Sequence, residues 1–334
     1  MNRDVRLDLM RFAAIVLVTL FHVWRFIGSP SERFGPFDLA APLEKGAMGV
    51  TIFVFVSGYL CRKSADAESA SDFLWRKLTR IVPVYYVALL IWNVLIYLGI
   101  TEKSHSLWDN IAHMLFVHNL GESTFYSVSG VFWYLGLQVQ LYLIFALMRN
   151  VIFSFPLLAV AVSFLLTIIA NTILSHPFPV LDRGVLSYGF PFVLGIVAAT
   201  RSSDLLPAFR AWPVFLSLSA LTVIVSLLPS IVPWGRLDFI VNGLLVCLAC
   251  VSLPEGGHLK MIAILCGRLA LASYSIYLYN YIFYSFDPTL SGAHGLVVYT
   301  AITLGFGAGA YFLIEKPIGE AVGRWTQFGK RCQG

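Results

Sequence analysis

The first apolar run of the chain carries three ionisable residues, Asp8, Arg11 and His22. An α-helix turns about 100° per residue, so the eleven steps from Arg11 to His22 end only about 20° past three full turns. Asp8 lies about 40° beyond His22, so all three side chains fall on one stripe, with Arg11 and His22 roughly 16 Å apart along the axis. Because ionisable side chains inside a membrane usually face a cavity or the bundle interior, this stripe predicts a water-filled cleft.

The chemistry open to this stripe centres on His22. An imidazole titrates near neutral pH, so His22 can take a proton from a hydroxyl as a general base. It can also carry a group covalently as a nucleophile, and the residues do not separate the two roles. Asp8 is too far down the helix to act on His22, so we assign it to Arg11. The alternative is that Asp8 and Arg11 anchor the helix at the interface and that His22 is a buried, hydrogen-bonded histidine.

A second candidate cluster lies in the segment WRKLTRIVPVYY, where Arg76 and Arg80 are four residues apart and share a helix face. Lys77 lies beside them, and Pro83 follows shortly after. Guanidinium groups bind phosphate bidentately, so this face is a candidate phosphate clamp. The alternative is ordinary positive charge at a cytoplasmic loop.

The elements that position these residues are membrane helices. The 334 residues are 58% hydrophobic and 12% charged, about half the roughly 25% charge of a soluble domain. This excludes a soluble enzyme, a disordered chain and a secreted disulfide scaffold. A crossing needs about 20 apolar residues, and the sequence predicts an all-α polytopic protein with about ten such helices. The expected helices lie near 10–28, 46–62, 81–100, 130–149, 151–174, 184–200, 211–229, 236–252, 262–285 and 294–314.

These helices are expected to form a single membrane domain over residues 1–334, with no appended soluble domain. The stretch 105–120 is too polar to span and is expected to be interfacial or re-entrant. With a cytoplasmic N-terminus, sixteen of the 23 Lys and Arg residues fall on that side and six on the other. This bias predicts that both termini are cytoplasmic. It also explains the net charge of +5 without a nucleic-acid partner.

No metal site is expected. Cys247 and Cys250 form a C-x-x-C pair, but zinc needs about four ligands and no His or second Cys pair lies nearby.

Six motifs in order along the chain resemble the acyltransferase-3 family of integral membrane acyltransferases, and the similarity runs from residue 6 to about 318. They are RLDLMRFAAIVLVTLFH, GVTIFVFVSGYL, WRKLTRIVPVYY, VFWYLGLQVQLYL, SYSIYLYN and IEKP. Three positions depart from the family pattern, with Gln138 in place of an acid, Asn280 in place of a histidine and Thr51 in place of a common Asp. A hydrogen-bonding role remains open to them.

The resemblance implies transfer of an acyl group, commonly acetyl, from cytoplasmic acyl-CoA to a hydroxyl of a glycan or lipid-linked sugar. The setting it implies is a bacterial cytoplasmic (inner) membrane. Catalysis is expected at His22, Arg11 and Asp8. Acetyl-CoA is expected to bind Arg76, Lys77, Arg80 and Ser57. The substrate-binding residues are expected to be Trp133, Gln138, Tyr142, Tyr277 and Asn280. Glu315 is expected to be structural and to pair with Arg76 or Arg80.

Other functions remain open from the sequence. A transporter or flippase of a glycan or lipid precursor also fits many spans with an intramembrane His and Arg. Within the enzyme class, the acyl group can be another one, such as succinyl, and the protein can be oligomeric. A sensor or scaffold has no positive feature. Acceptor choice is expected to depend on the loops 29–45 and 101–129 and on the outer end of the first helix. The residues expected to act there are Trp24, Trp108, His118, Asn119 and Tyr126, for which the alternative is an interfacial aromatic belt.

Overall fold

The computed structural model describes residues 4–31, 33–34, 37–38, 40–65, 68–101, 103, 106–174, 177–200, 210–227, 237–254, 257–282 and 289–331. This part of the chain is helical apart from a two-residue antiparallel pair, β1 (Arg33–Phe34) and β2 (Phe37–Asp38). Seven helical stretches in it are long and apolar enough to cross a membrane. They are Val5–Phe26, Ala40–Lys63, Ala70–Tyr97, Trp133–Ser154, Pro156–Leu174, Val180–Thr200 and Gly292–Trp325. The predicted all-α membrane class is therefore confirmed.

The α-helices in chain order are α1 (Val5–Phe26), α2 (Ala40–Glu44), α3 (Gly49–Ala65), α4 (Ala70–Tyr97), α5 (Leu107–Met114), α6 (Glu122–Phe125), α7 (Trp133–Ser154), α8 (Pro156–Ile169), α9 (Val185–Thr200), α11 (Trp212–Leu227), α12 (Leu237–Ser252), α13 (Gly257–Tyr279), α14 (Gly292–Ala310) and α15 (Lys316–Arg331). Short 3₁₀ turns cover Lys45–Met48, His118–Leu120 and Pro179–Arg183, and π-helical turns cover Ala170–Leu174 and Tyr311–Glu315.

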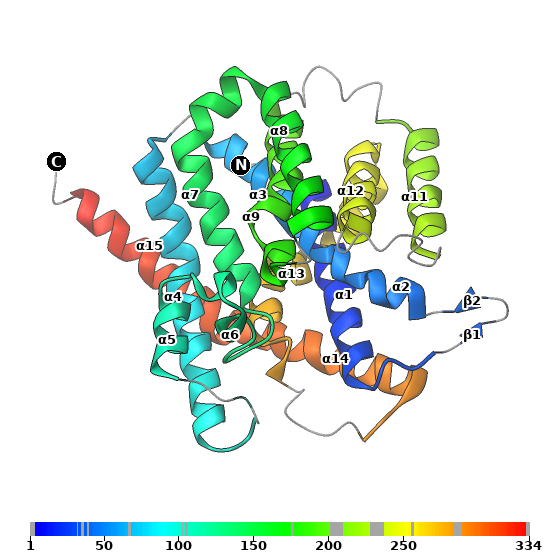
Figure 1. Cartoon of the computed structure of the whole chain (residues 1–334), viewed down its shortest axis with the longest axis horizontal. Helices are drawn as coiled ribbons and strands as arrows, with labels where there is room; N and C mark the ends of the chain where they lie inside the picture. The colour runs from blue at the N-terminus through cyan, green and yellow to red at the C-terminus, as the bar shows by residue number, and fades with distance from the viewer. Residues whose placement is uncertain are drawn as a thin grey trace.

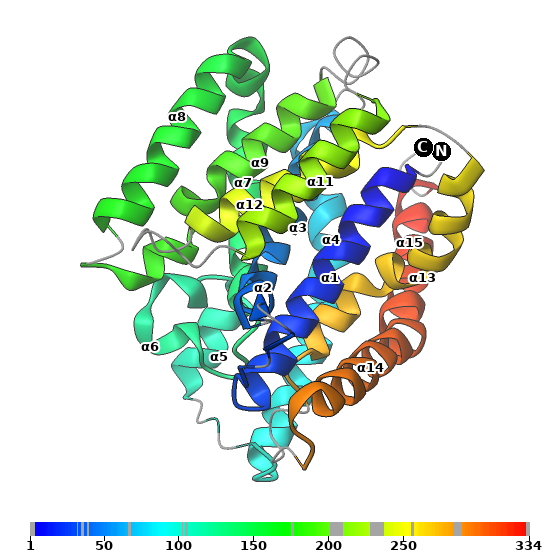
Figure 2. The same cartoon turned by 90° about the vertical axis from the view of Figure 1, so that its right-hand side faces the viewer.

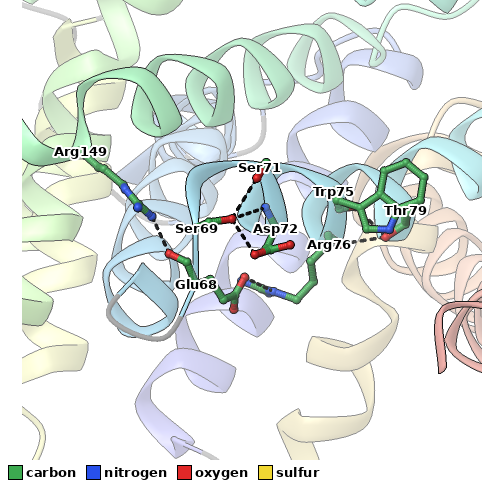
Figure 3. A network of polar contacts seen from close by, with 8 residues as sticks. All are labelled: Glu68, Ser69, Ser71, Asp72, Trp75, Arg76, Thr79 and Arg149. Carbon is green, nitrogen blue, oxygen red and sulfur yellow. Dashed lines mark hydrogen bonds and ion pairs between the residues drawn. The ribbon is translucent and has the colours of Figure 1, made fainter. Parts of the chain in front are cut away.

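Helix α4 begins eleven residues before the predicted start at 81. Ser69 caps it, because its hydroxyl accepts a hydrogen bond from the backbone N–H of Asp72 at 3.1 Å. Arg149, near the end of α7, donates to the Glu68 carbonyl at 2.8 Å and ties this start to the neighbouring helix (Figure 3). The first turns of α4 are polar, so hydropathy alone does not detect them. Their helical geometry fixes the positions of Lys77 and Arg80.

The predicted run 262–285 corresponds to α13, which ends at Tyr279; residues 283–285 lie outside the described residues, as do 228–229 and 236 of two other runs. The run 294–314 continues as one rod through the π-helical turn into α15 (Figure 1). Helix α1 begins and α15 ends toward the same end of the molecule (Figures 1 and 2). The stretch 105–120 contains only the eight-residue α5 and a 3₁₀ turn. At about 1.5 Å per residue, α5 is too short to span a bilayer.

Helix packing in the bundle depends on small residues. Helices α3 and α9 cross where a Cβ on Gly58 would overlap the backbone carbonyl of Phe192, and one on Gly195 would overlap that of Phe55. Only glycine allows such backbone contact, which is a common way to pack helices in membranes. Helix α1 packs against α3 and α13 (Figure 2). Ser57, next to Gly58, is thereby held at a fixed depth in the bundle.

At the end opposite the start of α1, helices α5 and α6 and the adjoining turns form an outer cap that encloses two histidines. The rings of His113 and His118 stack at 3.9 Å between centroids and are fully buried. His113 bonds to the Tyr85 hydroxyl at 2.8 Å, and His118 to the Phe132 carbonyl at 2.9 Å. Burial lowers the pKa of His113 to about 2 and that of His118 to about 4. Both rings are therefore neutral at physiological pH and act as structural groups of the cap.

The histidine pair predicts acid-sensitive folding. Below about pH 6.5 the unfolded chain binds protons that the folded protein does not, so the free energy of unfolding falls as the pH falls. Between about pH 7 and pH 5 the loss is on the order of 2 kcal/mol per histidine. Thermal unfolding of the purified protein in detergent at both pH values measures it. A His118→Gln variant should be less stable at neutral pH and less pH-dependent; an unchanged pH dependence in this variant would contradict the assignment.

Candidate active site

A cavity of about 140 Å³ lies between α1, α3, α4, α7 and α13. Seven residues that the sequence predicted as site residues line it: Arg11, Ser57, Lys77, Arg80, Gln138, Tyr142 and Tyr277. They come from five helices that are far apart in the chain. The structure therefore brings these side chains together at one cavity, and their role as site residues stays a prediction.

One end of the cavity is cationic. Arg11 comes from the N-terminal part of α1, and Lys77 and Arg80 come from the N-terminal part of α4. The Lys77 ammonium lies 4.8 Å from the centre of the Tyr142 ring, which is a cation–π distance. Three cations at one mouth attract an anionic group and supply several hydrogen-bond donors to its oxygens.

Arg76 does not share this mouth. Its Nε atom forms an ion pair with the Glu68 carboxylate at 3.0 Å, its side chain is 47% exposed, and it is not among the residues that line the cavity (Figure 3). Glu68 lies just before the cap of α4, so its carboxylate is within reach of a side chain in the second turn. The expected Arg76–Arg80 clamp is therefore not formed, and Lys77 and Arg11 accompany Arg80 instead.

Glu315 lies behind the cationic mouth, at the last residue of the π-helical turn. Its carboxylate accepts a hydrogen bond from the Ser275 hydroxyl at 2.6 Å. Arg80 and Arg11 are close enough for their charges to act on it. The Glu315 carboxylate thus offsets part of the positive charge of Arg80 and Arg11 at the mouth. Of the two partners expected for it, Arg80 is near, whereas Arg76 pairs with Glu68.

The other end of the cavity is aromatic and amide-lined. Gln138 is 4% exposed, and its Oε1 accepts hydrogen bonds from the Tyr134 hydroxyl at 2.7 Å and the Ser57 hydroxyl at 3.0 Å. Its Nε2 has no hydrogen-bond partner among the described residues. Three rings meet beside it, with centroid distances of 5.2 Å between Tyr134 and Tyr277, 6.1 Å between Phe53 and Tyr134, and 6.3 Å between Phe53 and Tyr277. We call these three rings the aromatic end of the cavity.

His22 lies beyond the aromatic end and is not among the cavity-lining residues. Its half-buried ring faces α13, where Nδ1 bonds to the Asn280 Oδ1 at 2.9 Å. Asn280 in turn donates from Nδ2 to the Thr19 hydroxyl at 2.8 Å. Because an amide oxygen only accepts, the proton sits on Nδ1 of His22 and Nε2 carries the lone pair. Asn280 therefore orients the imidazole, whereas the sequence suggested that it binds substrate.

Asn280 is three residues after Tyr277, which lines the cavity. The partner of the base candidate thus lies about one helical turn beyond a cavity-lining residue, just after the end of α13. The edge of the Tyr281 ring packs on His22 at 4.8 Å between centroids.

Asp8 and Trp133 lie outside the cavity lining. Asp8 is 4% exposed on α1, and its assignment to Arg11 remains a prediction. Trp133 stacks on Phe125 at 5.9 Å and so belongs to the outer cap. Thr51 packs against Gly243 of α12 and donates to the Phe239 carbonyl at 3.3 Å.

The residues expected to choose the acceptor divide into two groups. His118 and Asn119 are buried within the outer cap, and Trp24 is buried with its Nε1 bonded to the Pro30 carbonyl at 3.0 Å. These three are structural in this arrangement. Trp108 and Tyr126 are exposed, as either an acceptor contact or an interfacial belt requires.

Besides apolar residues, sequence reasoning missed three polar residues that line the cavity, Tyr134, Ser273 and Tyr274. Tyr134 is four residues before Gln138, so the two side chains share a helix face. This spacing could have predicted Tyr134 as a site residue. Tyr274 donates to the Ile81 carbonyl at 2.9 Å and ties α13 to α4 beside Arg80. Pro83 cannot donate to the carbonyl four residues earlier, so the backbone of α4 is less tightly bonded in this region.

Long apolar helices that enclose a cavity with three cations at one end define an integral membrane protein with a candidate ligand site inside the bundle. The chain matches a family model described as an acyltransferase domain over residues 4–315. It therefore belongs to the acyltransferase-3 family, and the resemblance seen in its motifs is confirmed.

The chain is also similar to a protein of Caenorhabditis elegans named Regulator of hypoxia-inducible factor 1. The two are 29% identical over 194 residues, which cover 50% of this chain and 38% of the relative. The matched region is thus well under half of the relative's length. No solved structure matches the chain.

Proposed function

We propose that this protein is a membrane O-acyltransferase that moves an acetyl group from cytoplasmic acetyl-CoA to a hydroxyl of a glycan or glycolipid. The observation that carries the proposal is the cationic mouth of Arg11, Lys77 and Arg80 on a buried cavity, in a chain of the acyltransferase-3 family.

The chemistry of the cavity suits an acyl-CoA. The donor has anionic phosphates at one end and a thioester on a long thin arm. A cavity of about 150 Å³ is known to hold one benzene molecule, so 140 Å³ admits an acyl group and part of the arm but excludes the nucleotide. The phosphates then stay at the mouth with the three cations, while the thioester points toward the aromatic end.

The reaction needs a base near the thioester. The acceptor hydroxyl attacks the thioester carbon, a new C–O bond forms and the C–S bond breaks. The hydroxyl proton passes to His22 Nε2 and from there to the departing sulfur, which leaves as the CoA thiol. A route through an acyl-imidazole uses the same nitrogen. The Asn280 hydrogen bond supports both routes, because it holds the proton on the other ring nitrogen.

The proposed setting is a bacterial cytoplasmic membrane, with ten crossings and both termini in the cytoplasm. The start of α1 and the end of α15 lie toward the same end of the molecule (Figure 2), as an even number of crossings requires. The cationic mouth is near that end, so it faces the compartment that holds acyl-CoA. His22 lies toward the opposite end, where an extracytoplasmic acceptor can approach.

An Arg80→Gln substitution tests the donor site. Loss of a charge-assisted hydrogen bond is expected to weaken acetyl-CoA binding roughly 10- to 150-fold. The readout is the rise in unfolding temperature of the purified protein with acetyl-CoA, which depends on the ratio of the acetyl-CoA concentration to its Kd. Arg76→Gln is the matched control, because the same change one turn away removes a cation outside the cavity. Equal acetyl-CoA affinity in the two variants would count against the donor site.

Mass spectrometry of surface glycans tests the reaction and the acceptor together. Cells without the gene should lose one acetyl mass per modified sugar, and a plasmid copy should restore it. A transporter would consume no thioester, so release of CoA thiol by purified protein with acceptor-containing membranes separates the two functions. Restored glycan export without thiol release would refute the acyltransferase assignment.

A further inference from the structure

The side chain of Gln138 is held in one orientation by the protein. Its Oε1 accepts from two hydroxyls, those of Tyr134 and Ser57. An amide nitrogen can only donate, and the two O–H donors are satisfied by the oxygen, so the Nε2 atom is left without a partner among the described side chains. The residue is 96% buried, at 4% exposure, and it lines the cavity. A buried unpaired N–H donor of this kind is costly unless a ligand supplies an acceptor.

The position of this donor along the cavity indicates which part of a ligand meets it. Tyr142, on the same helix, lies against Lys77 at the cationic mouth. Gln138 is one turn further along α7, about 6 Å deeper, beside Tyr134 and Tyr277 of the aromatic end. A donor that enters through the mouth with its phosphates held by the cations therefore brings its arm, and not its phosphates, to Gln138. The tip of an acyl-CoA carries the thioester carbonyl, whose oxygen is an acceptor.

The geometry points to the Gln138 Nε2–H as the hydrogen-bond donor to the thioester carbonyl oxygen of the bound acyl-CoA. This inference rests on the proposed function and assigns to Gln138 a catalytic role that its neutral amide makes possible. When the hydroxyl adds to the thioester carbon, negative charge develops on that oxygen, and a pre-positioned N–H stabilises it. A carboxylate at the same position would repel this charge. The amide in place of the acid is therefore a functional difference of this chain.

The test compares two probes, acetyl-CoA and S-ethyl-CoA, which differ mainly by the carbonyl oxygen. The wild-type protein is expected to bind acetyl-CoA roughly 5- to 150-fold more tightly, because S-ethyl-CoA leaves the buried N–H without an acceptor. In Gln138→Met, which removes the donor at similar volume, this preference should disappear. Gln140→Met is the matched control: its Nε2 already donates to the Phe116 carbonyl and to Asn119, so the preference should remain.

A second variant covers the case in which Gln138→Met does not fold. Gln138→Glu keeps the size and the acceptor oxygen but presents a carboxylate at neutral pH. Its acyl-transfer rate relative to wild type should fall roughly 100- to 1,000-fold near pH 8 and recover toward about pH 5, because protonation restores an O–H donor. A defect of packing alone would not recover with acid.

The outcomes separate this inference from the proposed function. If wild type binds acetyl-CoA but shows no preference over S-ethyl-CoA, or if Gln138→Met keeps the preference, the role of Gln138 is refuted while the acyltransferase function stands. A Gln138→Glu variant with wild-type rates at neutral pH refutes it as well. If wild type binds neither acetyl-CoA nor S-ethyl-CoA, both fail.

Discussion

Replacing His22 with alanine is expected to lower acyl transfer by about 10²- to 10⁴-fold, which is the usual contribution of a positioned general base. The protein should still fold, because the His22 partner Asn280 keeps its bond to Thr19. The measurement is the acetyl content of surface glycans in cells that carry only the variant, normalised to the amount of protein in the membrane.

Two further variants serve as a control and as an intermediate case for this prediction. His294 is exposed on α14, so His294→Ala should leave transfer unchanged. Asn280→Leu removes the acceptor that keeps the proton on Nδ1, and a loss of about 10- to 100-fold is expected by analogy with other groups that orient a histidine. Full transfer activity in His22→Ala would remove His22 from the mechanism whatever the other variants show.

Replacing Gly58 with valine is expected to abolish the folded state. Even a Cβ at this position overlaps the Phe192 carbonyl, and backbone cannot move aside as a side-chain tip can. Helices α3 and α9 must separate, which costs about 3 kcal/mol or more through overpacking and lost contacts. Loss of the monodisperse peak in size-exclusion chromatography of the detergent-solubilised protein measures it.

The matched control for this prediction is Gly189 on α9. A Cβ there meets nothing within 4 Å, so Gly189→Ala should be neutral or stabilising by up to about 1 kcal/mol through helix propensity. If Gly58→Val elutes and unfolds like the Gly189→Ala variant, then close contact between α3 and α9 does not hold the bundle together.

Hydropathy predicted most of the helices but not their polar ends. The apolar parts of α1, α3 and α7 to α9 coincide with predicted runs, because burial in lipid requires long apolar segments. The first turns of α4 were missed, since the Ser69 cap and the residues up to Arg80 are polar. Helix α15 was missed as well. Its Lys, Arg and Glu residues are typical of a tail, and its helical form depends on continuity with α14 through the π-helical turn.

Part of the site could be predicted because spacing along one helix is fixed. Arg11 was predicted from its charge within an apolar run, Lys77 and Arg80 from their clustering in one segment, and Gln138 from its motif. Contacts between distant helices could not be derived in this way. Asn280 bonds to His22 across 258 residues of sequence, and nothing in either segment alone indicates that pairing. Arg76 was misplaced, because the carboxylate of Glu68 competes for it from the preceding turn.

The three contacting rings of Phe53, Tyr134 and Tyr277 have an electrical consequence. Moving one elementary charge across a membrane potential of 100 mV is worth about 2.3 kcal/mol. An unbroken file of water past the cations would therefore let ions or protons leak across a membrane that holds such a potential. The three rings pack against one another at this end of the cavity, and their carbon atoms offer water no hydrogen-bond partners, so their contact interrupts such a file. The bundle can therefore carry three cations at one end of the cavity without an open aqueous path past the rings.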